Sequence, residues 1–303
     1  MAALRASGFA PQVLEVPPGE PSKSLSTLEQ VYDALIAAEV DRGGAIFALG
    51  GGVVGDLAGF AAATYMRGIT LVQVPTTVVA QVDSALGGKT AINHPRAKNL
   101  IGAFYQPRVI VADVMTLASL PEREFREGLA EVIKYGAIMD APMIEALELH
   151  LESILRREPA VLEEIVARSL RHKAAVVLSD ARESGLRKIL NFGHTAGHAL
   201  EASSGYGTFL HGEAVAIGMV AATKLSQAFA ELTAAEAERL QRLIERAGLP
   251  TQMPTGWRGE EFVRALRLDK KCAGDEVEFV LLDRLGDALT RKHTFAEILA
   301  HLS

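Results

Sequence analysis

Three separate segments of the chain carry histidine and glutamate side chains that could coordinate one metal ion. The segment NFGHTAGHALE carries His194 and His198, the segment LHGEAV carries His211, and the segment EGLAEVIKY carries Glu131. Imidazole and carboxylate ligands that leave one coordination position open are typical of catalytic zinc sites. The residue types therefore predict an enzyme with a divalent metal in its active site.

Spacing alone does not decide which histidines bind the metal. His194 and His198 lie four residues apart on a predicted helix, so their side chains face the same way. This spacing favours both as ligands, as in the H-E-x-x-H pattern. A single helical histidine is more often a hydrogen-bonded core residue, but two at this spacing, with Asn191 and Glu201 nearby, favour metal binding. His211 is a third candidate, and the choice of two among the three stays open.

Glu131 and Lys134 lie three residues apart on one face of a predicted helix. An isolated pair of this kind is usually an ion pair on the surface. Here the neighbouring residues are apolar, namely Leu129, Ala130, Val132 and Ile133. We therefore expect the pair to be at least half buried, and a buried pair of charges requires a functional or structural reason.

Two glycine-rich segments are suited to binding phosphate. The first is GGGVVGD at residues 50–56, which follows the apolar run AIFAL. Glycines before a helix let a pyrophosphate approach the backbone, although the pattern is neither G-x-G-x-x-G nor a Walker A loop. A tight turn that needs positive φ explains this segment equally well. The second is Gly87-Gly88-Lys89, where a lysine beside two glycines is well placed for a phosphate or carboxylate.

Composition narrows the class of protein. The chain has 303 residues, of which 49% are hydrophobic and 22% charged, as in ordinary soluble globular proteins. A formal net charge of −6 without a long basic run argues against a nucleic-acid partner. The single cysteine, Cys272, excludes a disulfide framework within the chain. No signal peptide or apolar run of about 18 residues is evident, so we expect a cytoplasmic protein without a membrane partner.

The order of predicted elements indicates two domains. Short apolar strands alternate with helices in the first part of the chain, which predicts an α/β nucleotide-binding domain with a mostly parallel sheet over residues 1–119. From residue 120 to 303 we expect a mainly helical domain that binds the metal and the substrate. The predicted strands are 13–16, 45–49, 69–74, 108–113 and 277–282, and the clearest predicted helices are 25–38, 54–63, 145–155 and 234–246.

These segments together resemble the 3-dehydroquinate synthase family, which belongs to the sugar-phosphate cyclases. The resemblance rests on PPGEPSKSL, GGGVVGDLAGF, TYMRG, PTTVVAQVDS, GGKT, KNLIGAFYQP, EGLAEVIKYG, NFGHTAGHA and LHGEAVAIG, which follow one another from residue 17 to residue 218. It implies NAD and one divalent metal, zinc or cobalt. It also implies conversion of 3-deoxy-D-arabino-heptulosonate 7-phosphate to 3-dehydroquinate and phosphate. The implied steps are transient oxidation by NAD, phosphate elimination, re-reduction, ring opening and an intramolecular aldol closure.

The resemblance also implies roles for individual residues. The metal ligands would be Glu131, His194 and His211, which leaves His198 on the substrate side. NAD would contact Glu20, Lys23, Gly52, Val53, Val54, Gly55, Asp56, Thr76, Thr77, Lys89, Lys98, Thr116, Leu117, Ala118 and Ser119, with Asp83 by the nicotinamide. The substrate phosphate would contact Lys89, Asn99, Asn191, His198 and a lysine of the Lys270-Lys271 pair, and the substrate carboxylate would contact Lys173 and Arg187. Arg67 is similar to a family arginine that reaches the partner's site in a homodimer.

Three alternatives to this function remain open from the sequence. One is a related cyclase of the valiolone or deoxy-inosose type, whose substrate lacks a carboxylate. Another is a metal-dependent alcohol dehydrogenase like glycerol dehydrogenase, which would accumulate NADH. The third is a binding protein without activity. Family members also carry a strand-helix-strand segment before the position of Met1. We therefore expect the sheet to lack its first strand, and the chain to be less stable than a version extended upstream.

Overall fold

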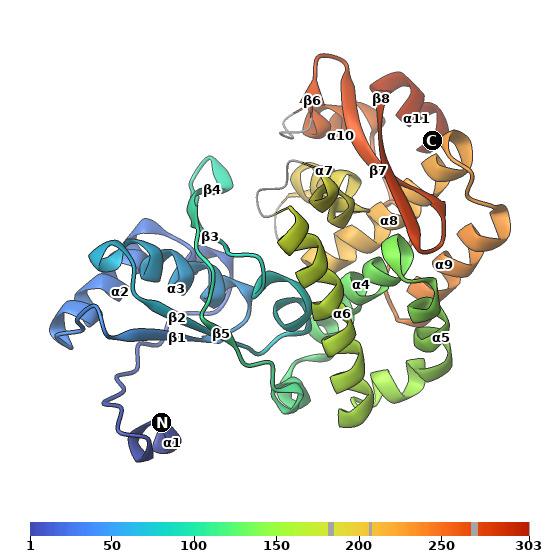
Figure 1. Cartoon of the computed structure of the whole chain (residues 1–303). Coiled ribbons are helices and arrows are strands. Elements are labelled where there is room, and N and C mark those ends of the chain that lie inside the picture. Colours follow the sequence, from blue (N-terminus) through green and yellow to red (C-terminus); the bar gives the residue numbers. More distant parts are fainter. Residues whose placement is uncertain (181–184, 206–207, 268–271, 303) are drawn as a thin grey trace. The chain divides into compact units, whose positions relative to one another are not determined.

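The computed structural model describes residues 1–180, 185–205, 208–267 and 272–302 (Figure 1). The chain divides into two compact units. Unit 1 contains Met1–Thr76 and Ser84–Asp113, and unit 2 contains Thr77–Asp83 and Val114–Ser303. Among the described residues, no helix is both long and apolar enough to cross a membrane.

Unit 1 is built on a parallel sheet, as the sequence predicts. Its strands β1 (Ala45–Gly50), β2 (Thr70–Pro75) and β5 (Val109–Ile110) pair in the order β1-β2-β5. Helix α3 (Gly52–Thr64) connects β1 to β2 and buries small and apolar side chains, as the composition of residues 54–63 predicts. Helix α2 (Leu25–Ala37) begins at Ser24, whose hydroxyl accepts a hydrogen bond from the Thr27 N–H and so caps the helix.

A hairpin in unit 1 was not among the strands predicted from the sequence. Strands β3 (Lys89–His94) and β4 (Ala97–Phe104) pair antiparallel, with Lys89 opposite Phe104. Helix α3 packs closely against β3, because a Cβ at Gly59 would lie 2.4 Å from Thr90 Cγ2. The hairpin therefore depends on a glycine in α3, which is a tertiary contact that strand propensity does not report.

The strand predicted over residues 13–16 is wrong. Residues 9–17 have no helix or strand in the described chain, and helix α1 (Ala2–Ala6) precedes them. A strand needs hydrogen bonds from a neighbouring strand, and prolines at both ends, Pro11 and Pro17, remove backbone donors there.

Strand β1 is covered on one face only. Ala48 is 2% exposed, whereas its neighbour Leu49 is 65% exposed.

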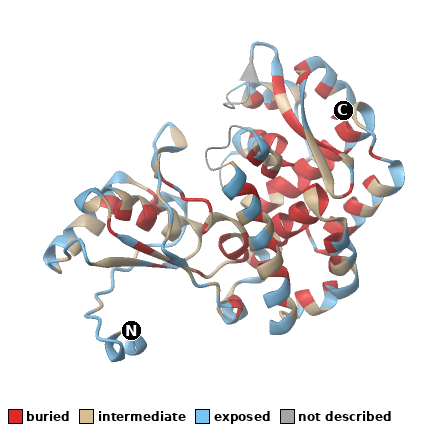
Figure 2. Cartoon of the chain, viewed as in Figure 1, coloured by how far each residue is buried: buried red, intermediate tan, exposed pale blue. Residues whose placement is uncertain are grey.

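Unit 2 is mainly helical, and its core lies around two long helices. Figure 2 shows α4 (Glu122–Met139) and α8 (His211–Phe229) largely buried, and they lie against each other. The other helices are α5 (Ala141–Leu155), α6 (Pro159–Ser179), α7 (His194–Ser204), α9 (Ala234–Arg246), α10 (Gly259–Leu266) and α11 (Phe295–Leu302). Short irregular helices are the π-helix η3 (Ala80–Ser84), of which Ser84 belongs to unit 1, and the 3-10 helices η4 (Val114–Ser119) and η5 (Leu186–Asn191).

A small antiparallel sheet completes unit 2. It contains β6 (Cys272–Ala273), β7 (Glu276–Arg284) and β8 (Asp287–Thr294) in the order β6-β7-β8. The sequence predicts β7 and the turn at Gly286, but not the returning strand β8. Strand β8 has only partial burial and lacks a clear apolar alternation, so its pairing with β7 is the main reason that it is extended.

Candidate metal centre

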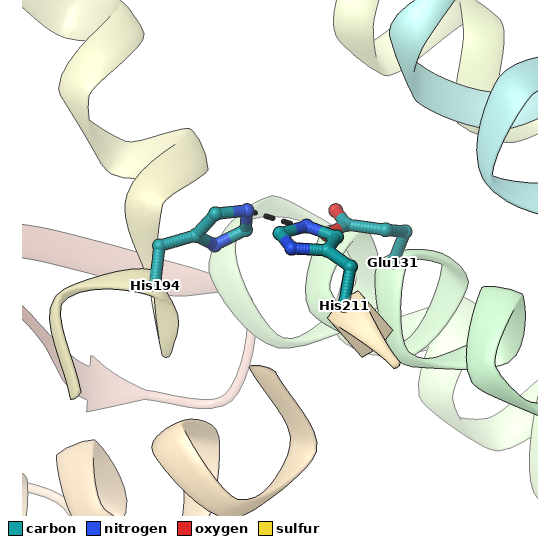
Figure 3. Close-up of side chains that lie close together, drawn as sticks. All are labelled: Glu131, His194 and His211. Carbon is teal, nitrogen blue, oxygen red and sulfur yellow. Dashed lines mark ion pairs between the residues drawn. The ribbon is translucent and has the colours of Figure 1, made fainter. Parts of the chain in front are cut away.

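Glu131, His194 and His211 gather in unit 2 with their polar atoms facing one another (Figure 3). One ligand atom from each lies within 4.8 Å of the other two. Nε2 of His194 lies 3.3 Å from Glu131 Oε1, and Nε2 of His211 lies 3.4 Å from the same oxygen. Two imidazoles and one carboxylate are the donor set of many catalytic zinc sites.

Each ligand comes from a different helix. Glu131 lies in the middle of α4 and is fully buried, while His194 and His211 are the first residues of α7 and α8. The helices can approach because glycines line their contacts. A Cβ at Gly212 would lie 1.8 Å from the Glu127 carbonyl oxygen, and a Cβ at Gly218 would lie 2.0 Å from the carbonyl oxygen of the residue before His194.

Gly193 sets the start of α7. Its φ is 78°, in the left-handed region that favours glycine. A Cβ there would also lie 2.6 Å from Met219 Cγ and 2.7 Å from the Val215 carbonyl oxygen in α8. The turn before α7 therefore needs glycine for its conformation and for space, and it fixes where His194 starts its helix.

The Glu131 carboxylate fits a cation. Both of its oxygens are buried, and they accept no hydrogen bond of good geometry from the described residues. Lys134 forms an ion pair with it and is 1% exposed, which confirms that this pair is buried. Burial alone would raise the pKa of Glu131, but Lys134 and His194 outweigh burial and hold that pKa well below its usual value. A buried carboxylate that is ionised and lacks hydrogen bonds is stabilised by a metal ion.

The two imidazoles differ in their surroundings. Burial, helped by the charge of Lys134, lowers the pKa of His194, so this ring is neutral and can donate a lone pair. Burial also opposes the charge of His211, but the Glu131 carboxylate outweighs it and raises the pKa of His211 to about 9. A metal at this position would replace the proton of His211, because ligation requires the neutral ring.

A second buried cluster lies in the same unit and involves Asp83 and Lys173, two predicted site residues. Lys173 Nζ lies 2.9 Å from Asp83 Oδ1 and also donates to the Asp83 backbone oxygen. The Tyr135 hydroxyl donates to the same carboxylate over 2.7 Å. Burial opposes the charge of Asp83, but Lys173 outweighs it and lowers the Asp83 pKa. The pKa of Lys173 itself is lowered, first by burial.

The sequence indicates the burial of Lys134 through its pairing with Glu131, but it does not single out Tyr135, the next residue of α4. Tyr135 is fully buried, and burial followed by the nearby Asp83 charge raises its pKa well above the ordinary value. The apolar neighbours of this stretch were the available signal, since they predict that both polar side chains are turned inward.

The remaining predicted residues of unit 2 are more scattered. Arg187 in η5 is 2% exposed, and Asn191 ends the same turn. His198 is exposed, with its ring centroid 5.5 Å from that of His194. The Thr77 hydroxyl accepts a hydrogen bond from the Ala80 N–H at the start of η3. The predicted pair Lys270-Lys271 lies outside the described residues.

The predicted NAD residues of unit 2 include the turn η4. Gln81 donates to the Thr116 hydroxyl over 3.1 Å. Arg157 donates to the Leu117 and Ala118 carbonyl oxygens, and Ser119 ends the turn. These contacts order the loop, and a role for it in binding NAD stays a prediction.

Unit 1 brings several predicted residues together. Lys23 is 3% exposed, and its ammonium lies 2.7 Å from Asp56 Oδ2 and 2.6 Å from Asn99 Oδ1. Glu20 lies 3.9 Å from the same ammonium. Residues 52–56 form the first turns of α3, directly behind β1, and the Thr76 N–H donates to the Gly50 carbonyl oxygen. A polar cluster thus lies beside a helix N-terminus, where a phosphate is favoured.

Three other predicted residues of unit 1 are on its surface or near it. Lys89 begins β3 and is exposed, whereas Lys98 in β4 is partly buried. Arg67 is exposed and has a φ of 66°. The roles of Lys89 and Asn99 toward phosphate, and of Arg67 toward a partner subunit, stay predictions.

Comparisons with known proteins identify the family. The model described as 3-dehydroquinate synthase N-terminal matches residues 13–127, and the model described as 3-dehydroquinate synthase C-terminal matches residues 128–272. The chain is 52% identical over 297 residues to 3-dehydroquinate synthase of Geobacter metallireducens, covering 98% of this chain and 82% of the relative.

Solved structures of related enzymes have the same fold as this chain. A 2-deoxy-scyllo-inosose synthase in complex with carbaglucose-6-phosphate, NAD+ and Co2+ is 31% identical, with a TM-score of 0.90 over 99% of this chain and 85% of that one. A 2-epi-5-epi-valiolone synthase of Streptomyces hygroscopicus with NAD+ and Zn2+ is 30% identical, with a TM-score of 0.87 over 95% and 80%. A probable glycerol dehydrogenase of Sinorhizobium meliloti, 19% identical with a TM-score of 0.60 over 95% and 82%, shares the fold alone. With both family models matched and half of its residues identical to a relative over nearly its whole length, the chain belongs to the 3-dehydroquinate synthase family.

Proposed function

We propose that the protein is a 3-dehydroquinate synthase, a lyase that converts 3-deoxy-D-arabino-heptulosonate 7-phosphate to 3-dehydroquinate and phosphate. The relative that is 52% identical carries this name, and both halves of the chain match its family. The observation that carries the proposal is the cluster of Glu131, His194 and His211, since this donor set suits a divalent metal with an open position. The product places the enzyme in the synthesis of aromatic amino acids by the shikimate pathway.

Two cofactors follow from this function, NAD and one divalent metal, zinc or cobalt. Glu131, His194 and His211 would hold the metal. When bound, the metal polarises hydroxyl oxygens of the substrate, and NAD accepts and later returns a hydride. Lys134 keeps the buried Glu131 carboxylate anionic, and so preserves a strong ligand.

Residues of the buried cluster in unit 2 would orient the substrate. Lys173 is 5% exposed and Arg187 is 2% exposed, so two cationic side chains lie in the buried part of unit 2. We assign both to the carboxylate of the substrate, with Asp83 keeping Lys173 protonated until the substrate arrives. His198 is exposed beside the metal ligands, which suits a contact with the substrate phosphate. Fixed geometry matters here because several steps must share one set of groups.

In unit 1, we assign NAD to the start of α3 and to the neighbouring polar residues. The helix N-terminus offers backbone N–H groups to a pyrophosphate, and Lys23 supplies a positive charge held by Asp56. Glu20 lies close to Lys23 and would contact the nucleoside. We further propose that the enzyme works in the cytoplasm as a homodimer, to which Arg67 contributes.

The first experiment is an assay of phosphate release from the heptulosonate phosphate, with NAD, with and without zinc and EDTA, while NADH absorbance is recorded. We expect release that EDTA abolishes and no net NADH. The matched control is His194→Ala, which removes one ligand and should be inactive with any added zinc. Accumulation of NADH would instead indicate an alcohol dehydrogenase. Turnover restricted to sugar phosphates without a carboxylate would indicate a cyclase of the valiolone or deoxy-inosose type.

A further inference from the structure

Unit 2 holds more metal-binding groups than one catalytic site uses. Three histidine rings lie together, with centroid distances of 5.2 Å between His194 and His211, 5.5 Å between His194 and His198, and 5.9 Å between His198 and His211. Glu131 accompanies two of these rings. The third ring, that of His198, has a carboxylate of its own close by, because Glu201 is three residues further along α7 and on the same face.

His198, Glu201 and His211 form a second possible ligand set. One ligand atom from each lies within 4.8 Å of the other two, which is the same limit that the set with Glu131 meets. For zinc at about 2.1 Å from each ligand, tetrahedral geometry needs about 3.4 Å between ligand atoms. Rotations of the exposed His198 side chain and of the partly buried Glu201 and His211 side chains would close this difference.

We propose that His198, Glu201 and His211 form a second, weaker site for a divalent metal of the zinc class. His211 would bridge this site and the catalytic centre, with one metal on each ring nitrogen and the remaining ring proton released to solvent. The inhibition described next rests on the proposed function, but the binding of a second metal does not. The site differs from the catalytic one in exposure. His198 is exposed and Glu201 and His211 are partly buried, whereas Glu131 is fully buried.

This difference in exposure sets the order of filling. Metal binding at the second site must displace water from the exposed His198 and the partly exposed Glu201, whereas Glu131 has already lost its hydration on folding. The buried carboxylate also gains more from a cation than an accessible one does, because water screens charges less there. The catalytic site therefore fills first, and the second site fills when free metal is in excess.

Occupation of the second site would inhibit the enzyme. The second metal would bind the other ring nitrogen of His211, a proposed ligand of the catalytic metal, and so weaken its bond to that metal. It would also occupy His198, a proposed contact of the substrate phosphate. Excess zinc should therefore raise KM for the heptulosonate phosphate and, at higher concentration, reduce kcat. Such a site would make the rate fall when free metal rises above the level that loads the catalytic centre.

The test begins with metal binding and does not depend on activity. Protein stripped with a chelator is equilibrated by dialysis against increasing Zn2+, and bound zinc is counted for the wild type, Glu201→Gln and Glu152→Gln. Glu152 has an 87% exposed side chain on α5, so its variant is matched in charge change but keeps the second ligand set. We expect two bound zinc ions for the wild type and Glu152→Gln. Glu201→Gln should keep the tight zinc and bind the second at least about tenfold more weakly.

Steady-state kinetics then test whether the second metal inhibits the enzyme. Inhibition by excess zinc should shift to at least about tenfold higher concentration in Glu201→Gln, while the rate with one equivalent of zinc stays that of the wild type. Co2+ offers a separate readout, since its ligand-field absorption should change on the second equivalent only where Glu201 is present. One bound zinc in the wild type, or two bound equally well in Glu201→Gln, would overturn the proposal. A wild type that binds two zinc ions but releases no phosphate would refute the proposed function and leave the second site standing.

Discussion

Replacement of Gly212 by alanine should damage the metal centre without removing any ligand. A Cβ at this position would lie 1.8 Å from the Glu127 carbonyl oxygen, whereas ordinary contact begins at 3.4 Å. The two backbones must then separate by roughly 1.6 Å, because neither contacting atom is the end of a flexible side chain. The movement would also stretch the hydrogen bond of 2.6 Å from the Gly212 N–H to Glu127 Oε2.

The consequence follows from the position of Gly212 next to His211. Metal ligands tolerate errors of about 0.2 Å, so a displacement several times larger should move Nε2 of His211 out of reach. We expect zinc affinity to fall by at least about a hundredfold, which is close to 3 kcal/mol. Overpacking between α4 and α8 should reduce stability by about 1–3 kcal/mol as well. For a protein of this size, that lowers the thermal midpoint by about 2–12 °C.

The assay combines zinc titration of the stripped protein with a thermal melt followed by circular dichroism. The control is Gly259→Ala at the start of α10, where a new Cβ would meet the flexible end of Leu299 at 3.0 Å. We expect that variant to bind zinc like the wild type. Wild-type zinc affinity in Gly212→Ala would refute the reasoning, since it would mean that the glycine contact does not set the position of His211.

Three further variants test the buried polar groups of unit 2. Lys173→Met leaves the Asp83 carboxylate buried without its cation, so we expect a loss of about 3–5 kcal/mol in urea unfolding at neutral pH, whereas Lys173→Arg should lose less. Tyr135→Phe removes the hydroxyl that donates to Asp83, and should cost about 1–3 kcal/mol in the same assay, with Tyr65→Phe, which also removes one hydroxyl donor, as the reference. Asp140 accepts two hydrogen bonds from Arg168 at 2.7 Å and caps α5, and although burial opposes it, Arg168 and His172 lower its pKa. Its stabilisation is therefore complete above the ordinary carboxyl pKa and lost as pH falls through the lowered one. Asp140→Asn should lower the thermal midpoint at pH 7 and bring it close to that of the wild type in strong acid, and equal midpoints at pH 7 would contradict this.

Local signals predicted the elements that carry them. Helix α9 has the predicted bounds, Ala234–Arg246, because both the capping residue Thr233 and the helical spacing of apolar residues are local features of the sequence. Helix α2 follows its serine cap in the same way. The hairpin β3-β4 and strand β8 carry no such signal. Their extended form comes from neighbours such as α3 and β7, and a single segment does not reveal its neighbours.

The assignment of the segment after β2 to one of the two units also depends on contacts that the sequence does not reveal. The sequence pattern changes near residue 120 from alternating strands and helices to long helices. By contacts, however, Thr77–Asp83 groups with the helical unit, although residues on both sides of it belong to unit 1. Asp83 in this segment is held by Tyr135 from α4 and by Lys173 from α6. A polar contact that is distant in sequence thus assigns the segment to a unit, and periodicity does not record such contacts.

Sequence spacing was least informative about which histidines bind the metal. His194 and His198 share a helical face, and spacing of this kind treats them alike. The structure separates them by burial, because His194 lies at the first turn of α7, behind Gly193 and against α8, whereas His198 one turn later reaches solvent. The partner of His194 is Glu131, which is 63 residues earlier in the chain and is brought near by close contacts at glycines. Residue types therefore predict that a metal binds, while the backbone contacts that glycine permits determine which side chains can share it.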